Sequence, residues 1–147
     1  RFIPHLKNSD EIWHAGDIGS LDVYDKLTKL SDVKAVYGNI DNHKIRIGLK
    51  SELFFKCEGL NIYMTHIGGY PGKYSKGIKE KIEKTNPNIF ICGHSHILKI
   101  MNDKKNKLLF LNPGAAGNHG VHKVKTIIKF DVDDKEIRNL KIIELKR

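Results

Sequence analysis

The first forty residues alternate short apolar runs with polar turns, in the order of a strand, a helix and a second strand. Residues 2–7 are typical of the end of a helix, and DEIWHAGD at residues 10–17 predicts a short strand that runs into a loop. The next segment predicts a helix, because Ser20 is a suitable N-cap and apolar side chains recur at helical spacing. Residues 33–39 predict a second strand that ends in a glycine and a polar residue. This order favours a parallel sheet with functional groups at the carboxyl ends of its strands.

After residue 42 the pattern changes to paired strands. Apolar runs and turn residues predict a hairpin over 52–66, a helix from residue 77 that ends before Pro87, a buried strand over 88–96, and hairpins over 98–114 and 126–145. The strand that begins at residue 88 reads as buried on both faces, because its apolar run is continuous instead of alternating. Parallel strands early and antiparallel hairpins late predict an α/β domain with two sheets.

Composition narrows the class of protein. A chain of 147 residues is long enough for one domain with its own core. It has no long apolar run and no signal-peptide pattern, so we expect a cytoplasmic protein with no membrane association and with Cys57 and Cys92 as reduced thiols. The net charge of +9 favours anionic ligands, but the lysines are interleaved with acids. That spacing disfavours nucleic acid as the main partner.

Four stretches share one arrangement, in which an apolar strand and a tight turn lead to a side chain that can bind metal. They end in Asp17, in Asn39 with Asp41, in His66, and in His94 with His96. Taken singly, each has a plain structural explanation, because Gly-Asp and Gly-Asn pairs are usually turns and a lone histidine is usually a surface or core group. On extended chain, however, histidines two residues apart lie on one face about 6.5 to 7 Å apart, which suits two metal ions about 3.5 to 4 Å apart.

The order of these motifs (GD, then GN-x-D, then a strand-end His, then GHxH) resembles the calcineurin-like metallophosphoesterase superfamily. It is most similar to the small bacterial and archaeal phosphodiesterase branch, which also carries a strand-end LNPG like residues 111–114. The resemblance covers essentially the whole chain. It implies an α/β fold built as a four-layer sandwich of two mixed sheets flanked by helices.

The resemblance also implies two divalent metal ions. Asp17 matches the aspartate that bridges the two ions, and His96 matches a ligand of the first ion. Asn39, His66 and His94 match the remaining ligands of the second ion. Oxygen and nitrogen donors without a thiolate suit Mn²⁺, with Fe, Zn²⁺ and Ni²⁺ as alternatives.

The chain departs from the family pattern at two places. The family's opening D-x-H is absent, so we expect residues 1–147 to be a single, N-terminally incomplete domain whose first strand is missing. Many relatives have a histidine directly after the asparagine, where this chain has Ile40. Asp41 and His119, which lies in a glycine-rich loop that can cover the site, are therefore the candidate catalytic residues. His14 is a candidate supporting residue, with a packed core histidine as the alternative.

The resemblance implies a two-metal phosphoesterase that hydrolyses phosphodiesters through a hydroxide held between the metals. Its expected partner is a small anionic phosphodiester substrate, and assembly into a homo-oligomer is left open. The alternative from another class is a scaffold protein of the same fold that has lost activity, like the retromer subunit of this superfamily. A third class, a basic nucleic-acid binder, would bind in a salt-dependent and metal-independent way.

Overall fold

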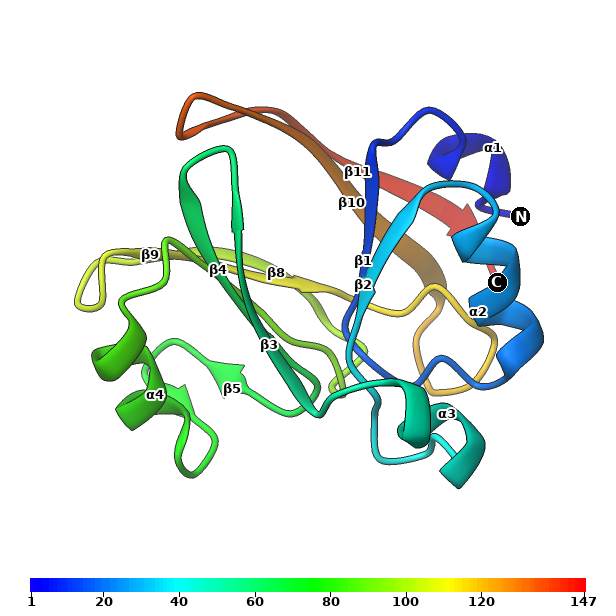
Figure 1. The fold of residues 1–147 in the computed structure, drawn as a ribbon, viewed down its shortest axis with the longest axis horizontal. Helices are drawn as coiled ribbons and strands as arrows, with labels where there is room; N and C mark the ends of the chain where they lie inside the picture. The colour runs from blue at the N-terminus through cyan, green and yellow to red at the C-terminus, as the bar shows by residue number, and fades with distance from the viewer.

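The computed structural model describes all residues, 1–147, and its largest element is a five-stranded mixed sheet in the order β3-β4-β7-β9-β8 (Figure 1). The strands are β3 (Glu52–Cys57), β4 (Leu60–Thr65), β7 (Ile89–Ile91), β9 (Leu108–Pro113) and β8 (Leu98–Asp103). The three central strands are parallel, and the two outer strands pair antiparallel with them. The carboxyl ends of β4, β7 and β9 therefore share one edge.

The centre of this sheet is buried on both faces, as the continuous apolar run predicts. Every residue of β7 is buried, and on one face Phe90 stacks on Tyr63 with ring centroids 4.9 Å apart. Ile78 and Ile82 of α4 (Ile78–Thr85) are buried in the same apolar cluster. This helix covers one face of the sheet. A small hairpin formed by β5 (Gly69–Tyr70) and β6 (Lys73–Tyr74) precedes it.

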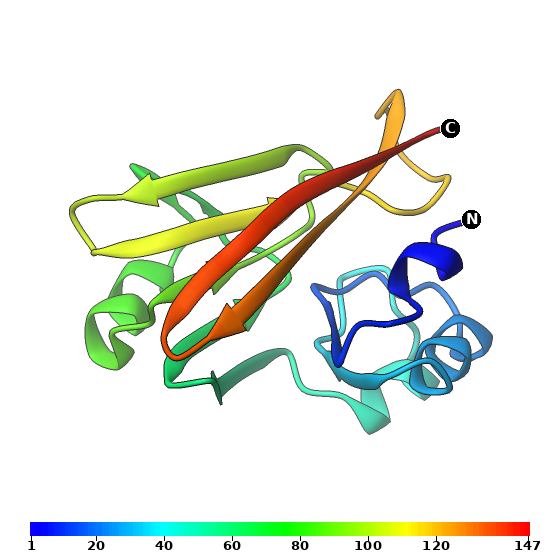
Figure 2. The ribbon, with the colours of Figure 1, turned by 90° about the horizontal axis from the view of Figure 1, so that it is seen from above.

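The other face of the sheet packs against a second β layer. One part of this layer is the parallel pair of β1 (Glu11–His14) and β2 (Asp32–Ala35), joined through α2 (Leu21–Thr28). The other part is the long antiparallel hairpin of β10 (Val124–Asp133) and β11 (Glu136–Lys146). In Figure 2 this hairpin, orange to red, crosses over the five-stranded sheet and lies beside the blue N-terminal segment that contains β1.

Trp13 of β1 holds the parts of the core together. Its ring lies 5.1 Å from that of Phe55 in the five-stranded sheet and 5.6 Å from that of Phe130 in the hairpin. On the outer side of β2, Ile45 of α3 (His43–Gly48) and Tyr24 of α2 pack together. A short helix, α1 (Ile3–Leu6), precedes β1.

The predicted mixed α/β fold is confirmed, and each predicted hairpin and helix is present. One detail differs, because the second layer is not one mixed sheet. Its parallel pair and its hairpin are separate two-stranded sheets with no ladder between them. None of the helices has the length and apolar character needed to span a bilayer.

Candidate metal centre

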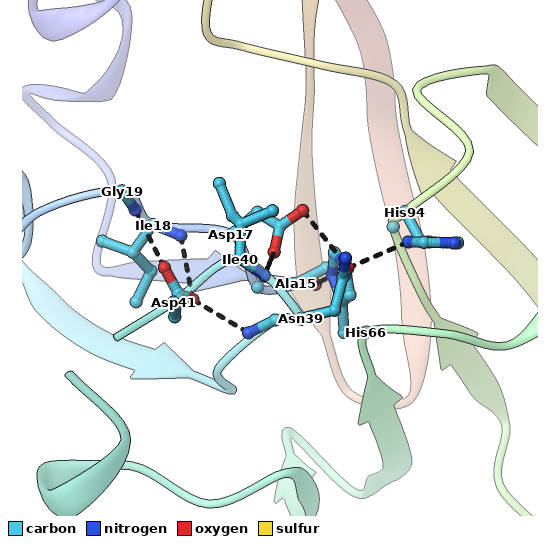
Figure 3. A network of polar contacts seen from close by, with 12 residues as sticks. Ala15, Asp17, Ile18, Gly19, Asn39, Ile40, Asp41, His66 and His94 are labelled. Carbon is cyan, nitrogen blue, oxygen red and sulfur yellow. Dashed lines mark hydrogen bonds and ion pairs between the residues drawn. The ribbon is translucent and has the colours of Figure 1, made fainter. Parts of the chain in front are cut away.

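The ligands expected from the sequence follow the carboxyl ends of parallel strands. Asp17 follows β1 and Asn39 follows β2, while His66 follows β4 and His94 follows β7. Strands of the two layers thus deliver side chains to one place, although these residues are far apart in sequence. Figure 3 shows these four side chains gathered together.

His66 is the centre of the cluster, and only 5% of it is exposed. Its Nδ1 lies 2.7 Å from the carbonyl oxygen of Ala15, which can only accept, so Nδ1 carries the proton. In the neutral ring Nε2 then presents a lone pair. Yet Nε2 faces two oxygens, Oδ1 of Asn39 at 2.9 Å and Oδ2 of Asp17 at 3.2 Å. Rotating the Asn39 amide would relieve one contact, but the Asp17 carboxylate remains an acceptor.

A nitrogen lone pair that faces oxygen acceptors is favourable only when a positive charge lies among them. A proton on His66 would supply it, and so would a metal ion. Ligands about 2.1 Å from a metal and at right angles to each other are about 3 Å apart, which is close to the separations seen here. The donor chemistry of Asp17, Asn39 and His66 therefore fits a divalent ion.

His94 extends this group, whereas His96 lies apart from it. Nδ1 of His94 is 3.1 Å from Oδ1 of Asn39, and the His94 ring lies edge-on to that of His66 at 5.2 Å. His96 instead packs against His122, with ring centroids 5.4 Å apart. Burial, followed by the neighbouring imidazole of His122, lowers the pKa of His96, while Asp17 acts in the opposite direction. No three His, Cys, Asp or Glu side chains are arranged to hold a metal ion, so the tight cluster depends on the Asn39 amide.

The backbone is strained at several of these positions. Asp17, His94 and His96 have φ values of 58°, 67° and 61°, in the left-handed region that costs an L-residue about 1–2 kcal/mol. Such conformations gather at functional sites, where the surrounding fold enforces them.

Two glycines allow the strand ends to approach each other. A Cβ at Gly38 would lie 2.7 Å from Cγ of Asp17, and a Cβ at Gly16 would lie 2.8 Å from Cγ of His66. A larger residue at either position would displace Asp17 or His66. Both glycines are therefore part of the candidate site, although they carry no functional group.

Asp41 binds the backbone of the turns that carry Asp17 and Asn39. It is 4% exposed, and its carboxylate accepts backbone N–H groups from Gly38 at 2.8 Å, Gly19 at 3.0 Å and Ile18 at 3.1 Å. Burial raises the pKa of Asp41, but these three hydrogen bonds together lower it by a larger amount. The net pKa therefore lies below the usual range of an aspartate. The expected catalytic role of Asp41 stays a prediction. In this structure both of its carboxylate oxygens accept backbone hydrogen bonds, which join the turns after β1 and β2.

The remaining candidates are placed as follows. Nδ1 of His14 accepts the backbone N–H of Gly16 at 3.2 Å, and burial lowers the pKa of this histidine. His14 therefore supports the turn that carries Asp17. His119 is exposed, and none of the side-chain hydrogen bonds of the cluster involves it, so its expected catalytic role stays a prediction.

Sequence reasoning missed Asn112, which fixes the turn that carries His94 and His96. Its Nδ2 donates to the carbonyl oxygen of Gly93 at 3.0 Å and to Oγ of Ser95 at 3.1 Å, and only 3% of the residue is exposed. The asparagine in the strand-end LNPG was the available signal. Its contact crosses between β9 and the end of β7, and no local pattern encodes that pairing.

Comparison with known proteins identifies a family and a shared fold. Residues 1–135 match the model of the calcineurin-like phosphoesterase superfamily domain. The chain is 28% identical over 112 residues to a probable metallophosphoesterase of Methanothermobacter thermautotrophicus, a match that covers 75% of the chain and 62% of that relative. The chain thus spans less than two thirds of the relative's length.

Two solved structures illustrate the shared fold. An archaeal phosphodiesterase has a TM-score of 0.76 and 22% identity, with 97% of the chain and 87% of that structure covered. Vps29 of Entamoeba histolytica, in complex with Zn²⁺, has a TM-score of 0.75 and 20% identity, with 99% and 87% covered. At these identities the likeness shows the fold alone.

Proposed function

The chain belongs to the calcineurin-like phosphoesterase superfamily, and we propose that it is a metal-dependent phosphodiesterase. The observation that carries the proposal is the Nε2 atom of His66, which presents a lone pair to two oxygen acceptors. A divalent cation between these three side chains would satisfy the lone pair and both oxygens at once.

Asp17, Asn39, His66 and His94 would hold one ion, and His96 belongs to a second. A divalent ion there supplies positive charge that stabilises phosphoryl oxygens and acidifies a nucleophilic water. The donors are oxygens and imidazole nitrogens, which suit Mn²⁺, Fe, Zn²⁺ or Ni²⁺.

The surrounding residues keep these donors in place. The Ala15 carbonyl fixes the tautomer and the orientation of His66, as an outer partner of a metal ligand does. The backbone N–H of Ile40 donates to Oδ1 of Asp17 at 3.1 Å, which sets the direction of the other carboxylate oxygen. Arg46 closes the turn that carries Asn39, since its guanidinium donates to the carbonyl oxygens of Asp41 and Asn39 at 2.8 Å and 3.1 Å.

The proposed substrate is a small anionic phosphodiester. Hydrolysis breaks one P–O ester bond, and water gives its hydroxyl group to phosphorus and its proton to the leaving oxygen. Ile40 is 61% exposed beside Asp17 and cannot donate a side-chain proton to a leaving group. We therefore expect faster hydrolysis of esters whose leaving groups are acidic, such as p-nitrophenol.

The test is hydrolysis of bis-p-nitrophenyl phosphate with added Mn²⁺, Zn²⁺ or Ni²⁺, against the same protein in EDTA. We expect turnover that needs metal and ends on chelation. Metal binding at this cluster without turnover in the presence of any of these ions would contradict the proposed phosphodiesterase activity. The scaffold alternative would then be the better account.

A further inference from the structure

His122 is the histidine that the proposed site does not use, and it lies against one that the site does use. Its ring meets that of His96 nearly at right angles, at 86°, with the centroids 5.4 Å apart. His122 belongs to the glycine-rich loop between β9 and β10, whereas His96 follows β7. Two imidazoles from separate parts of the chain therefore meet beside the cluster of Asp17, Asn39, His66 and His94.

The hydrogen bond of His122 fixes its tautomer. Nε2 lies 2.9 Å from the carbonyl oxygen of Gly117, which can only accept, so Nε2 carries the proton. In the neutral ring Nδ1 then has a free lone pair, and this atom is buried without any hydrogen-bond partner. Buried polar atoms are rarely left unpaired. A histidine that binds metal commonly donates its other N–H to a backbone carbonyl, as His122 does.

Gly120 shows that the Nδ1 atoms of His96 and His122 lie close to the same point beside its Cα atom. A Cβ built at this residue would lie 2.9 Å from Nδ1 of His122 and would also overlap Nδ1 of His96. A side chain at residue 120 would therefore stand against both nitrogens. Arg147 holds this loop in place, because its guanidinium donates to the carbonyl oxygens of Gly120 at 2.6 Å and His122 at 3.2 Å.

We propose that the Nδ1 atoms of His96 and His122 together bind a divalent transition-metal ion, separate from the ion held by the Asp17 cluster. The proposal rests on the proposed function, because His96 is assigned there to the second ion. It adds a ligand from the glycine-rich loop. Two imidazoles favour Zn²⁺, Ni²⁺ or Co²⁺ over Mg²⁺ and Ca²⁺, which prefer oxygen.

The experiment is a titration of EDTA-stripped, dialysed protein with Co²⁺ and with Zn²⁺. Isothermal calorimetry gives the number of ions and their affinities, and the visible absorption of Co²⁺ reports its ligands. Wild type should bind two ions. His122→Ala should weaken one of them more than about tenfold, which is at least the loss expected from removing an outer partner of a ligand, and leave the other unchanged.

Two further variants make the result specific. His119→Ala removes an exposed histidine of the same loop and should leave both affinities unchanged. Gly120→Ala keeps both imidazoles but places a methyl group against both Nδ1 atoms, so it should weaken the same ion as His122→Ala. Circular dichroism and thermal unfolding confirm that each variant is folded. A single bound ion in wild type, or unchanged binding in His122→Ala, overturns the proposal.

Hydrolysis measured on the same samples separates this inference from the proposed function. Loss of one ion in His122→Ala, together with no turnover in wild type, would support His122 as a metal ligand and contradict the proposed phosphodiesterase activity. Metal-dependent turnover in wild type, together with unchanged metal binding in His122→Ala, would support the phosphodiesterase activity and contradict the role of His122 as a metal ligand.

Discussion

The two ends of the β-strands use the same backbone conformation for different purposes. Left-handed, non-glycine residues turn the chain at one end and carry the candidate metal ligands at the other. At the hairpin end they are Glu58, Lys107, Asp134 and Lys135, and at the site end they are Asp17, His94 and His96. The backbone cost is similar in both places, about 1–2 kcal/mol per residue. What offsets it differs.

At the hairpin end the strained residues allow tight turns, and the ladders on either side supply the stabilising hydrogen bonds. Two of these turns also meet, because the backbone N–H of Lys135 donates to the carbonyl oxygen of Glu58 at 2.9 Å. At the site end, the side chain of His94 is exposed, and its contacts are one hydrogen-bond distance to Oδ1 of Asn39 and the edge of the His66 ring. Strain without a matching gain in packing indicates that the fold maintains this conformation for the side chain's chemistry.

The largest expected difference between the two ends is in activity. His94→Ala should reduce metal-dependent hydrolysis more than about 100-fold, since even the outer partners of metal ligands contribute 10- to 100-fold. Lys107→Ala changes a residue of the same backbone conformation at the other end of the sheet and should leave turnover unchanged. Turnover of bis-p-nitrophenyl phosphate by folded protein measures both. Equal activity in the two variants would remove His94 from the site.

A second pair of variants tests the close approach of the strand ends. Gly38→Ala would push a methyl group into the Asp17 carboxylate, whose Cγ would lie 2.7 Å away. We expect a loss of about 1–3 kcal/mol from overpacking and roughly tenfold weaker metal binding. Denaturant unfolding and metal titration measure these effects.

Gly59→Ala is the matched change in the β3–β4 turn. Its Cβ would meet the flexible side chain of Lys135, with Cγ at 2.8 Å, and Gly59 has a φ of 85°. It should cost about 1–2 kcal/mol through backbone strain and leave metal binding unchanged. Weaker metal binding in Gly59→Ala than in Gly38→Ala would contradict the assignment of the metal site to the end of the strands that contains Gly38.

The hairpin end could be predicted from the sequence, but the site end only in part. Apolar runs such as Ile89–Ile91, bounded by turn residues, encode strands locally, and a turn needs only its own few residues. The ligand types at the site were also visible because each follows a strand. The partners of Asp41, Asn112 and His122 were not visible, because each contact joins segments that only the folded chain brings together.

Two buried carboxylates extend the comparison to acid stability. Asp41 holds the turns at the site, and Asp103 holds the β8–β9 turn through Tyr74 Oη at 2.6 Å and the Asn106 side chain at 2.8 Å. Burial raises the pKa of Asp103, but its hydrogen bonds from Tyr74 and Asn106 lower it by a larger amount. The Asp41 and Asp103 carboxyl groups therefore both have a net pKa below the usual range. A lowered folded-state pKa means that the unfolded chain binds protons first as the pH falls. Stability is therefore full above the unfolded pKa of about 3.9 and is lost as the pH falls through the lower, folded pKa.

Asp41→Asn and Asp103→Asn should each cost about 1–3 kcal/mol at pH 7, because an amide cannot accept all of these hydrogen bonds. Each should also flatten the decline of stability below about pH 4. Only Asp41→Asn should weaken metal binding. Urea unfolding between pH 2 and pH 7 and metal titration measure the two effects. An acid profile identical to that of wild type in Asp41→Asn would contradict the lowered pKa.

The smallest expected effect isolates the backbone strain itself. His94→Ala and His94→Gly both remove the imidazole, so their difference in stability reports only the backbone. Because glycine adopts positive φ freely and alanine does not, His94→Gly should be more stable than His94→Ala by about 1 kcal/mol.

The same comparison at Lys107, whose φ is 54°, should give a difference of the same sign and size. At Glu83 in α4 the sign should reverse, because glycine is about 1 kcal/mol worse than alanine within a helix. Urea unfolding of the six variants measures all three differences. A glycine variant no more stable than the alanine variant at residue 94, alongside the expected difference at 107, would show that the hairpin end carries strain and the site end does not. If the two differences are equal, the chain bears the same backbone cost at both ends, and only the site end requires a particular side chain.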